Sequence, residues 1–242
     1  MRKEFAVNLN HPLKVNNAAT TFFTGNRCFL CSSPGKGHET ICRACLKDLA
    51  LNTDACPACA KPDSASRLCA DCLNKRKTFI DNTWALFDYH YPVNRLIQHI
   101  KFNQGIDVAN YLGGMLSELF LKNKAARPDC IIPVPLHCRR LIARGYNQSV
   151  ELARPVSRQL GIKLDTSSCK RIRATTPQAD LPAKKRRQNV RNAFSVSKSL
   201  DYRHVLLIDD VITTGSTVNE LARMLSLAGV RQVDVLAVAR AG

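Results

Sequence analysis

Short apolar runs alternate with amphipathic segments along the chain from Trp84 onward. An apolar run of about 4–8 residues is typical of a strand buried on both faces of a sheet, whereas apolar residues at spacings of three and four predict a helix with one buried face. The predicted strands are Ile131–Val134, Val205–Ile208 and Val233–Ala239, and the predicted helices are Ser149–Leu160 and Thr217–Leu227. This alternation predicts an α/β fold with a mostly parallel sheet flanked by helices.

The strand Val205–Ile208 runs directly into a pair of acids. Carboxylates at the end of a buried strand are costly unless they are paired or solvated. Asp209 and Asp210 can accept hydrogen bonds from neighbouring sugar hydroxyls, or can hold a hard cation such as Mg2+. Open α/β sheets bind ligands at the carboxyl ends of their strands, so this pair marks a candidate site.

The segment after the acids has the composition of an anion site. It consists of Thr213, Thr214, Gly215, Ser216 and Thr217. Its N–H groups and hydroxyls can surround a phosphate, and the next helix adds unsatisfied N-terminal donors and a positive dipole end. The alternative is an ordinary strand–helix turn with a tolerated acid pair. The chain has no GxxxxGK[ST] sequence, which argues against a P-loop nucleoside triphosphatase.

Cysteines are concentrated near the N-terminus, where four CxxC pairs are separated by 10, 10 and 9 residues. Two such pairs can supply the four thiolates of a tetrahedral site, so four pairs predict two structural zinc ions, joined sequentially or in a cross-braced order. Disulfides, a redox centre and an iron–sulfur site are the weaker alternatives. The predicted ligands are Cys28, Cys31, Cys42, Cys45, Cys56, Cys59, Cys69 and Cys72.

These patterns divide the chain into an N-terminal tail at residues 1–25, a double zinc ribbon at 26–76 and an α/β domain at 77–242. The ribbon has few large apolar residues, so we expect it to need metal to fold. No apolar run approaches the roughly 18 residues of a membrane span, and residues 1–25 lack the apolar stretch of a secretory signal. We therefore expect a cytoplasmic protein without a membrane span.

Basic residues outnumber acidic residues by 36 to 19, which gives a net charge of +17. Such an excess attracts polyanions. A pyrophosphorylated sugar, a nucleic acid or both are therefore candidate ligands. Aromatic residues make up only 6% of the chain, which weakly supports stacking platforms for single strands.

Arginines gather after the predicted strand Ile131–Val134. Arg139, Arg140 and Arg144 are predicted to lie in a loop before the helix Ser149–Leu160. Guanidinium groups suit bidentate phosphate binding, and at the end of a neighbouring strand they would face the same ligand as the acids. The alternative is a solvated basic turn.

A second basic stretch spans Arg171–Phe194 and contains Lys184–Arg187. It is predicted to be a mobile loop that leads into a basic helix. If it closes over a ligand, it would exclude water from the reaction. The alternatives are a contact surface for nucleic-acid phosphates and a solvated charged helix.

The run VLLIDDVITTGST resembles, at every position, the PRPP (phosphoribosyl pyrophosphate) motif of the type I phosphoribosyltransferases. The resemblance implies that Asp209 and Asp210 orient the ribose during catalysis, and that Thr213–Thr217 bind the 5′-phosphate. Mg2+ would accompany PRPP and neutralise the pyrophosphate. Further pyrophosphate contacts would come from Arg139, Arg140 and Arg144, with Lys101 as a weaker candidate, and Arg171–Phe194 would serve as the lid.

The chain also resembles the ComF family (also called GntX or amidophosphoribosyltransferase-like) from about Cys28 to Arg240. The resemblance rests on the cysteine pairs, the PRPP motif and the stretches LIQHIKFNQG, PVPLHCRRLIARGYNQS and ATTPQADLPAKKRRQNVRNAF. It implies a double zinc ribbon joined to a type I phosphoribosyltransferase domain. It also implies a role in natural competence, through the uptake or use of external DNA. PRPP, single-stranded DNA and proteins of the DNA-uptake machinery are the partners that follow from it.

No pattern in the chain identifies an acceptor for phosphoribosyl transfer. No nucleophilic cysteine follows Met1, which argues against a glutamine-hydrolysing amidotransferase. Two hypotheses follow. One is a PRPP-dependent transferase with an unknown acceptor. The other is a non-catalytic, nucleic-acid-binding accessory protein in which PRPP is only a ligand or signal.

Overall fold

The computed structural model describes residues 27–34, 40–74, 78–102, 105–174, 190–197 and 200–242. Three sequence predictions concern segments outside these ranges. They are the N-terminal tail at residues 1–25, the domain boundary between residues 76 and 77, and the middle of the predicted lid, which includes Lys184–Arg187.

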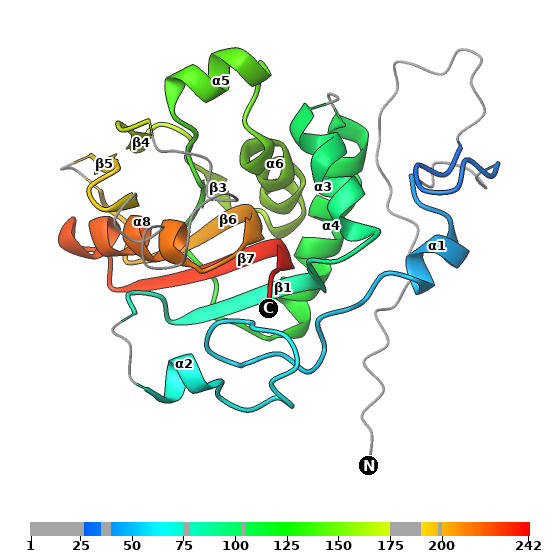
Figure 1. Ribbon diagram of the computed structural model, residues 1–242. Helices are drawn as coiled ribbons and strands as arrows, with labels where there is room; N and C mark the ends of the chain where they lie inside the picture. The colour runs from blue at the N-terminus through cyan, green and yellow to red at the C-terminus, as the bar shows by residue number, and fades with distance from the viewer. Residues whose placement is uncertain (1–26, 35–39, 75–77, 103–104, 175–189, 198–199) are drawn as a thin grey trace.

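A five-stranded parallel sheet forms the centre of the molecule, with the strand order β1-β7-β6-β2-β3 (Figure 1). Its strands are β1 (Asn82–Asp88), β2 (Cys130–Pro133), β3 (Lys163–Leu164), β6 (His204–Ile212) and β7 (Gln232–Arg240). A separate antiparallel pair consists of β4 (Cys169–Arg171) and β5 (Phe194–Val196). The parallel sheet confirms the predicted α/β fold.

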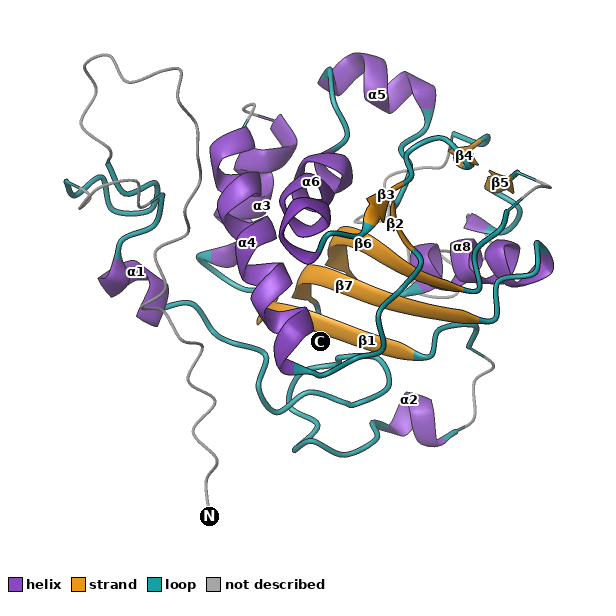
Figure 2. Cartoon of the chain, turned by 180° about the vertical axis from the view of Figure 1, so that it is seen from behind, coloured by secondary structure: helices purple, strands orange, loops and turns teal. Residues whose placement is uncertain are grey.

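Helices cover both faces of this sheet (Figures 1 and 2). One face carries α3 (Val93–Phe102), α4 (Ile106–Lys122) and α6 (Gln148–Leu160), and the other carries α8 (Ser216–Leu227). Leu206 and Ile208 of β6 therefore pack toward the three-helix layer, while Val205 and Leu207 pack toward α8. The short helices are α1 (Arg43–Lys47), α2 (Ala70–Leu73) and α5 (Cys138–Arg144).

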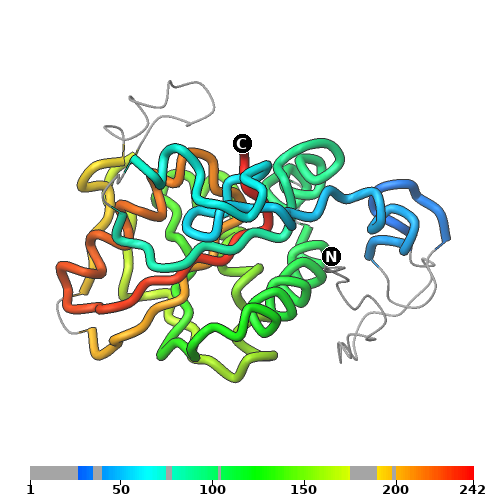
Figure 3. Tube along the Cα trace, turned by 90° about the horizontal axis from the view of Figure 1, so that it is seen from below, coloured from blue at the N-terminus to red at the C-terminus, as the bar shows by residue number. Residues whose placement is uncertain are grey.

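The later part of the cysteine-rich segment packs along the β1 edge of the sheet (Figure 3). Leu51 forms an antiparallel bridge with Phe87, and the Asn52 N–H donates to the Leu86 carbonyl at 3.0 Å. Cys28 and Ile41 belong to the same buried cluster as α3 and α4. The first half of the ribbon therefore shares the core of the α/β domain, since its few apolar residues cannot form a core alone.

Several local predictions differ from the structure. Strand β6 continues to Ile212, so the acid pair lies inside the strand rather than after it, because pairing with β7 extends to Arg240. The arginines predicted in a loop lie on helix α5, which His137 caps at its start and Gly145 ends in the left-handed region, with φ +83°. Helix α8 begins at Ser216, one residue earlier than predicted.

Among the described residues, no helix combines the length and the apolar character that crossing a membrane requires.

Candidate functional site

Two adjacent carboxylates lie within β6, directly after its last pair with β2 (Pro133 with Ile208) and inside its pairing with β7. Asp209 is 8% exposed and Asp210 is 5% exposed. Asp209 pairs with Ala237 of β7 in the sheet register. Because successive strand residues point to opposite faces, the pair offers carboxylates to both sides of this end of the sheet.

The loop before α6 positions a partner for Asp209. The Ser149 hydroxyl donates to Asp209 Oδ1 at 3.1 Å, and the Asp210 N–H donates to the same oxygen at 2.9 Å. Asn147 holds Ser149 in place, because its side chain accepts from the Ser149 N–H at 3.0 Å and donates to the Val134 carbonyl at 3.0 Å. These residues belong to the RGYNQS stretch.

Lys101 forms an ion pair with one of the two acids, Asp210. It lies in the last turn of α3, and its Nζ is 2.6 Å from Asp210 Oδ2. The Tyr146 hydroxyl donates to the Ile100 carbonyl and so ties this turn to the loop before α6. Lys101 was a weak candidate from the sequence, and the structure brings it to the acids.

The charges of these groups are strongly coupled. Burial raises the pKa of Asp209 well above its ordinary value, and the neighbouring Asp210 raises it further. Burial opposes ionisation of Asp210 too, but Lys101 outweighs it and holds the pKa of Asp210 below its ordinary value. Burial would lower the pKa of Lys101, yet Asp210 raises it. The site therefore favours the neutral form of Asp209 beside the Lys101–Asp210 ion pair.

The segment Thr213–Thr217 turns from β6 into α8. Gly215 has φ +71°, a conformation that favours glycine, and directly precedes the helix. The hydroxyls of Thr214 and Ser216 lie 2.8 Å apart. A cavity of about 20 Å³ is lined by Asp209, Thr213, Gly215, Ser216, Thr217 and three apolar neighbours. The turn can therefore present N–H groups and hydroxyls to an anion beside the acids.

Of the three predicted arginines, Arg144 is linked to the acids through Gln148, and Arg140 lies near Arg144. Arg144 donates to Gln148 Oε1 at 2.5 Å, and Gln148 also helps to lower the pKa of Asp210. Burial lowers the pKa of Arg140, and the nearby Arg144 charge lowers it further. Arg139 is exposed, and no described contact links its side chain to the acids.

Arg171 of β4 is a further cation at this site, although the sequence indicated it only as part of the predicted lid. It is 9% exposed. Burial lowers its pKa, Arg140 lowers it further, and Asp209 opposes both. Arg140 and Asp209 therefore both lie close enough to Arg171 to influence its charge. Ser149 was also missed, because nothing in the local sequence pattern indicates its contact with β6.

The eight paired cysteines form two clusters in sequential order. In each cluster the four Sγ atoms lie within 4.8 Å of one another, and the clusters are Cys28, Cys31, Cys42, Cys45 and Cys56, Cys59, Cys69, Cys72. The Cys31 and Cys42 Sγ atoms are 3.7 Å apart, far longer than the roughly 2.05 Å of a disulfide. Hydrogen bonds from Ser33 lower the pKa of Cys31 to about 6. Four thiolates at this spacing fit structural zinc.

Arg240 joins the second cysteine cluster to the phosphate-type turn. It is the last residue of β7 and is 7% exposed. Its Nε donates to the Cys59 carbonyl at 3.0 Å, and its guanidinium also donates to the Ile212 and Thr213 carbonyls. This residue was missed in the sequence, although an arginine at the end of a buried apolar strand is an unusual signal.

Two family models match the chain. The double zinc ribbon domain matches residues 19–73, and the phosphoribosyl transferase domain matches residues 146–242.

The chain matches three curated relatives over most of the length of each relative. The chain is 37% identical to the DNA utilization protein YhgH of Escherichia coli O157:H7, over 88% of this chain and 96% of that protein. It is 35% identical to competence protein F of Haemophilus influenzae, over 90% of this chain and 99% of that protein. It is 26% identical to competence protein ComFC of Bacillus subtilis, over 78% and 79%.

Replacing Asp209 by Asn is expected to stabilise the folded protein at neutral pH. Because the folded-state pKa of Asp209 is raised, the wild-type chain loses stability as pH rises from the unfolded pKa toward the folded one. The gain in free energy of unfolding should be roughly 0.5–2 kcal/mol at pH 7 and should vanish below about pH 4. Asp210→Asn is the matched control and should destabilise, because it leaves Lys101 without its carboxylate. Urea unfolding measures both, and a destabilising Asp209→Asn would contradict the assignment.

The purified chain is expected to contain two zinc ions, measured by elemental analysis. Cys59→Ser should remove one ion, because Cys59 belongs to the second cluster. Cys138→Ser is the control, since Cys138 is exposed and lies outside both clusters. A wild-type chain with one zinc or none would refute the double ribbon.

Proposed function

Since the chain belongs to the ComF family of phosphoribosyltransferase-like proteins, we propose that it binds PRPP at the end of β6. The observation that carries this proposal is the buried acid pair, held between Lys101 and Ser149 and followed at once by the turn into α8.

The acid pair suits the ribose of this ligand. Asp209 and Asp210 can accept hydrogen bonds from two vicinal hydroxyls, since each carboxyl has oxygen lone pairs beyond those already used. The turn Thr213–Thr217 can take the 5′-phosphate on its N–H groups and hydroxyls. The acids lie in the central strand and the turn follows that strand directly, and a site positioned in this way before binding loses less entropy when the ligand binds.

Mg2+ fits this proposal as a companion of the ligand. Lys101 already balances the charge of Asp210, and burial raises the pKa of Asp209, which disfavours its ionised form. The free acid pair is therefore a weak site for a hard cation, which prefers ionised oxygen ligands. We propose that the metal arrives with the pyrophosphate, whose charge it neutralises.

We propose that the pyrophosphate lies on the cationic side of the acids. Arg140, Arg144 and Arg171 carry the charge there, and Lys101 is the nearest cation to Asp210. In a transfer reaction these cations would stabilise the departing pyrophosphate, while the acids hold the ribose in place. Arg139 is the least supported of the sequence candidates, because it is exposed.

A role in the use of external DNA is supported by the names of the relatives, which refer to DNA utilization and competence. The net charge of +17 favours contact with a polyanion. We propose that the chain contacts single-stranded DNA and acts beside the proteins of DNA uptake.

A second candidate function is ligand binding without transfer. The Lys101–Asp210 ion pair favours it, because this contact must be rearranged or shared before the ribose can reach Asp210. In that role PRPP, or a similar sugar phosphate, would act as a signal for the DNA-handling activity.

Calorimetric titration with PRPP and Mg2+ tests the binding site. The double variant Asp209→Asn/Asp210→Asn should bind about 100-fold more weakly, because the lost charged acceptor, Asp210, contributes about 1.5–3 kcal/mol. Asp201→Asn is the control, since Asp201 is exposed before β6. Unchanged affinity in the double variant would sink the ribose assignment.

Pyrophosphate release separates the two candidate functions. The protein is incubated with PRPP, Mg2+ and a panel of bases, amines and oligonucleotides. Release that depends on one acceptor supports transfer, whereas tight PRPP binding without release across the panel supports the binding role.

A further inference from the structure

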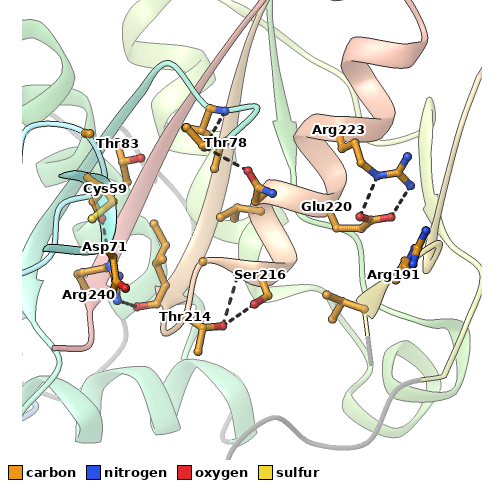
Figure 4. A pocket seen from close by; sticks show the side chains of 18 of the residues that line it. Cys59, Asp71, Thr78, Thr83, Arg191, Thr214, Ser216, Glu220, Arg223 and Arg240 are labelled. Atoms are coloured by element: carbon orange, nitrogen blue, oxygen red, sulfur yellow. Dashed lines mark hydrogen bonds and ion pairs between the residues drawn. The ribbon is translucent and has the colours of Figure 1, made fainter. Parts of the chain in front are cut away.

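A pocket of about 770 Å³ lies between the second cysteine cluster and the start of α8. Figure 4 shows Cys59 and Asp71 of the ribbon on one side, Glu220 on the other, and Thr214 and Ser216 at its base. Its volume falls in the roughly 300–1,000 Å³ typical of small-molecule sites. The two acids of β6 and Lys101 do not line it, so it is separate from the ribose position.

This pocket adjoins the proposed phosphate position. The small cavity beside the acids and the large pocket share four lining residues, which are Ile212, Gly215, Ser216 and Val218. The hydroxyl pair of Thr214 and Ser216 also lines the pocket. A phosphate on this turn would therefore border the pocket, and a substituent on that phosphate would have room to enter it.

The walls of the pocket combine aliphatic side chains with hydrogen-bond donors. Leu68 and Ile80 contribute apolar surface. The Thr83 hydroxyl has no partner among the described residues, although Thr83 is only 5% exposed and lines the pocket. Asn219 Oδ1 accepts from the Phe79 N–H at 2.9 Å, so its NH₂ group is the end left to donate. Apolar faces with in-plane acceptors are the surface of a nucleobase.

A positive charge lies at the rim of the pocket. Arg223 is bound to Glu220 at 2.7 Å, and Arg240 is bound to backbone carbonyls. Arg191 is exposed at the rim, and its charge lowers the pKa of Glu220 only as a minor cause. Its guanidinium is therefore available to a second phosphate.

We propose that this pocket holds the nucleoside that precedes the bound phosphate in a single-stranded nucleic acid. The proposal rests on the proposed phosphate site. A 3′-terminal nucleotide would place its sugar at Asp209 and Asp210 and its 5′-phosphate on the turn Thr213–Thr217. The preceding nucleoside, joined through its 3′-oxygen, would fill the pocket, and the strand would leave past Arg191. The second zinc ribbon thus forms one wall of a strand-end site.

The affinities of three ligands for the full-length, zinc-loaded protein test this assignment. The ligands are the dinucleotide TpT, thymidine 5′-monophosphate, and PRPP with Mg2+. TpT should bind at least about 10-fold more tightly than the monophosphate, as expected if one buried base contributes about 1–3 kcal/mol. Leu68→Trp, which fills the pocket, should abolish that difference and leave PRPP affinity unchanged.

Two further variants sharpen the result. Thr83→Val removes the hydroxyl without changing shape and should reduce TpT affinity about 5-fold, as for one lost hydrogen bond. Leu73→Trp is the matched control, because Leu73 is exposed on the same ribbon but does not line the pocket. It should bind TpT like the wild type.

Each outcome has a separate meaning. If PRPP binds but TpT gains nothing over the monophosphate, or if its advantage survives Leu68→Trp, the pocket assignment is overturned and the PRPP site stands. If the wild type binds neither PRPP nor either nucleotide, the phosphate site itself fails and the pocket assignment falls with it.

Discussion

The burial of two adjacent carboxylates in the central strand is the constraint on which the rest of this molecule depends. Such a pair is tolerated only when nearby groups compensate for the lost hydration. Lys101 from α3 supplies the charge, Ser149 from α6 supplies a hydrogen bond, and the pKa of Asp209 is raised by burial and by Asp210. Side chains from two helices on one face of the sheet therefore contact the acids. The cost is characteristic of a functional site, where stability is sacrificed for a ligand.

The zinc ribbon contributes both to the core of the α/β domain and to the site after the acids. Cys28 and Ile41 complete the core beside α3, and Arg240 connects the Cys59 carbonyl to the turn after the acids. Metal binding thus stabilises more than the ribbon, because the second cluster also supports the wall of the pocket and the position of that turn. If the ribbon were an appended module that bound DNA independently of the α/β domain, its contacts with that domain would not be needed.

Much of this arrangement could be predicted from the sequence where the signal is local. The strand, acids, turn and helix from Val205 to Leu227 lie together in the chain, and four CxxC pairs leave few alternatives to zinc. The order of cysteine pairing was open, because the spacing fits both arrangements. Helix α5 was missed, since the prolines before it indicated a loop and its cap depends on His137. Lys101, Ser149, Arg171 and Arg240 act through contacts between distant segments, for which a single sequence carries no local pattern.

A carbon-13 NMR titration of the aspartate carboxyl groups tests the central claim most directly. Asp209→Asn and Asp210→Asn would assign the two signals. The account predicts that Asp209 titrates well above the ordinary value of about 3.9 and Asp210 below it, and that Lys101→Met raises the pKa of Asp210. Two carboxyl groups that both titrate in the ordinary range, unaffected by Lys101→Met, would contradict it.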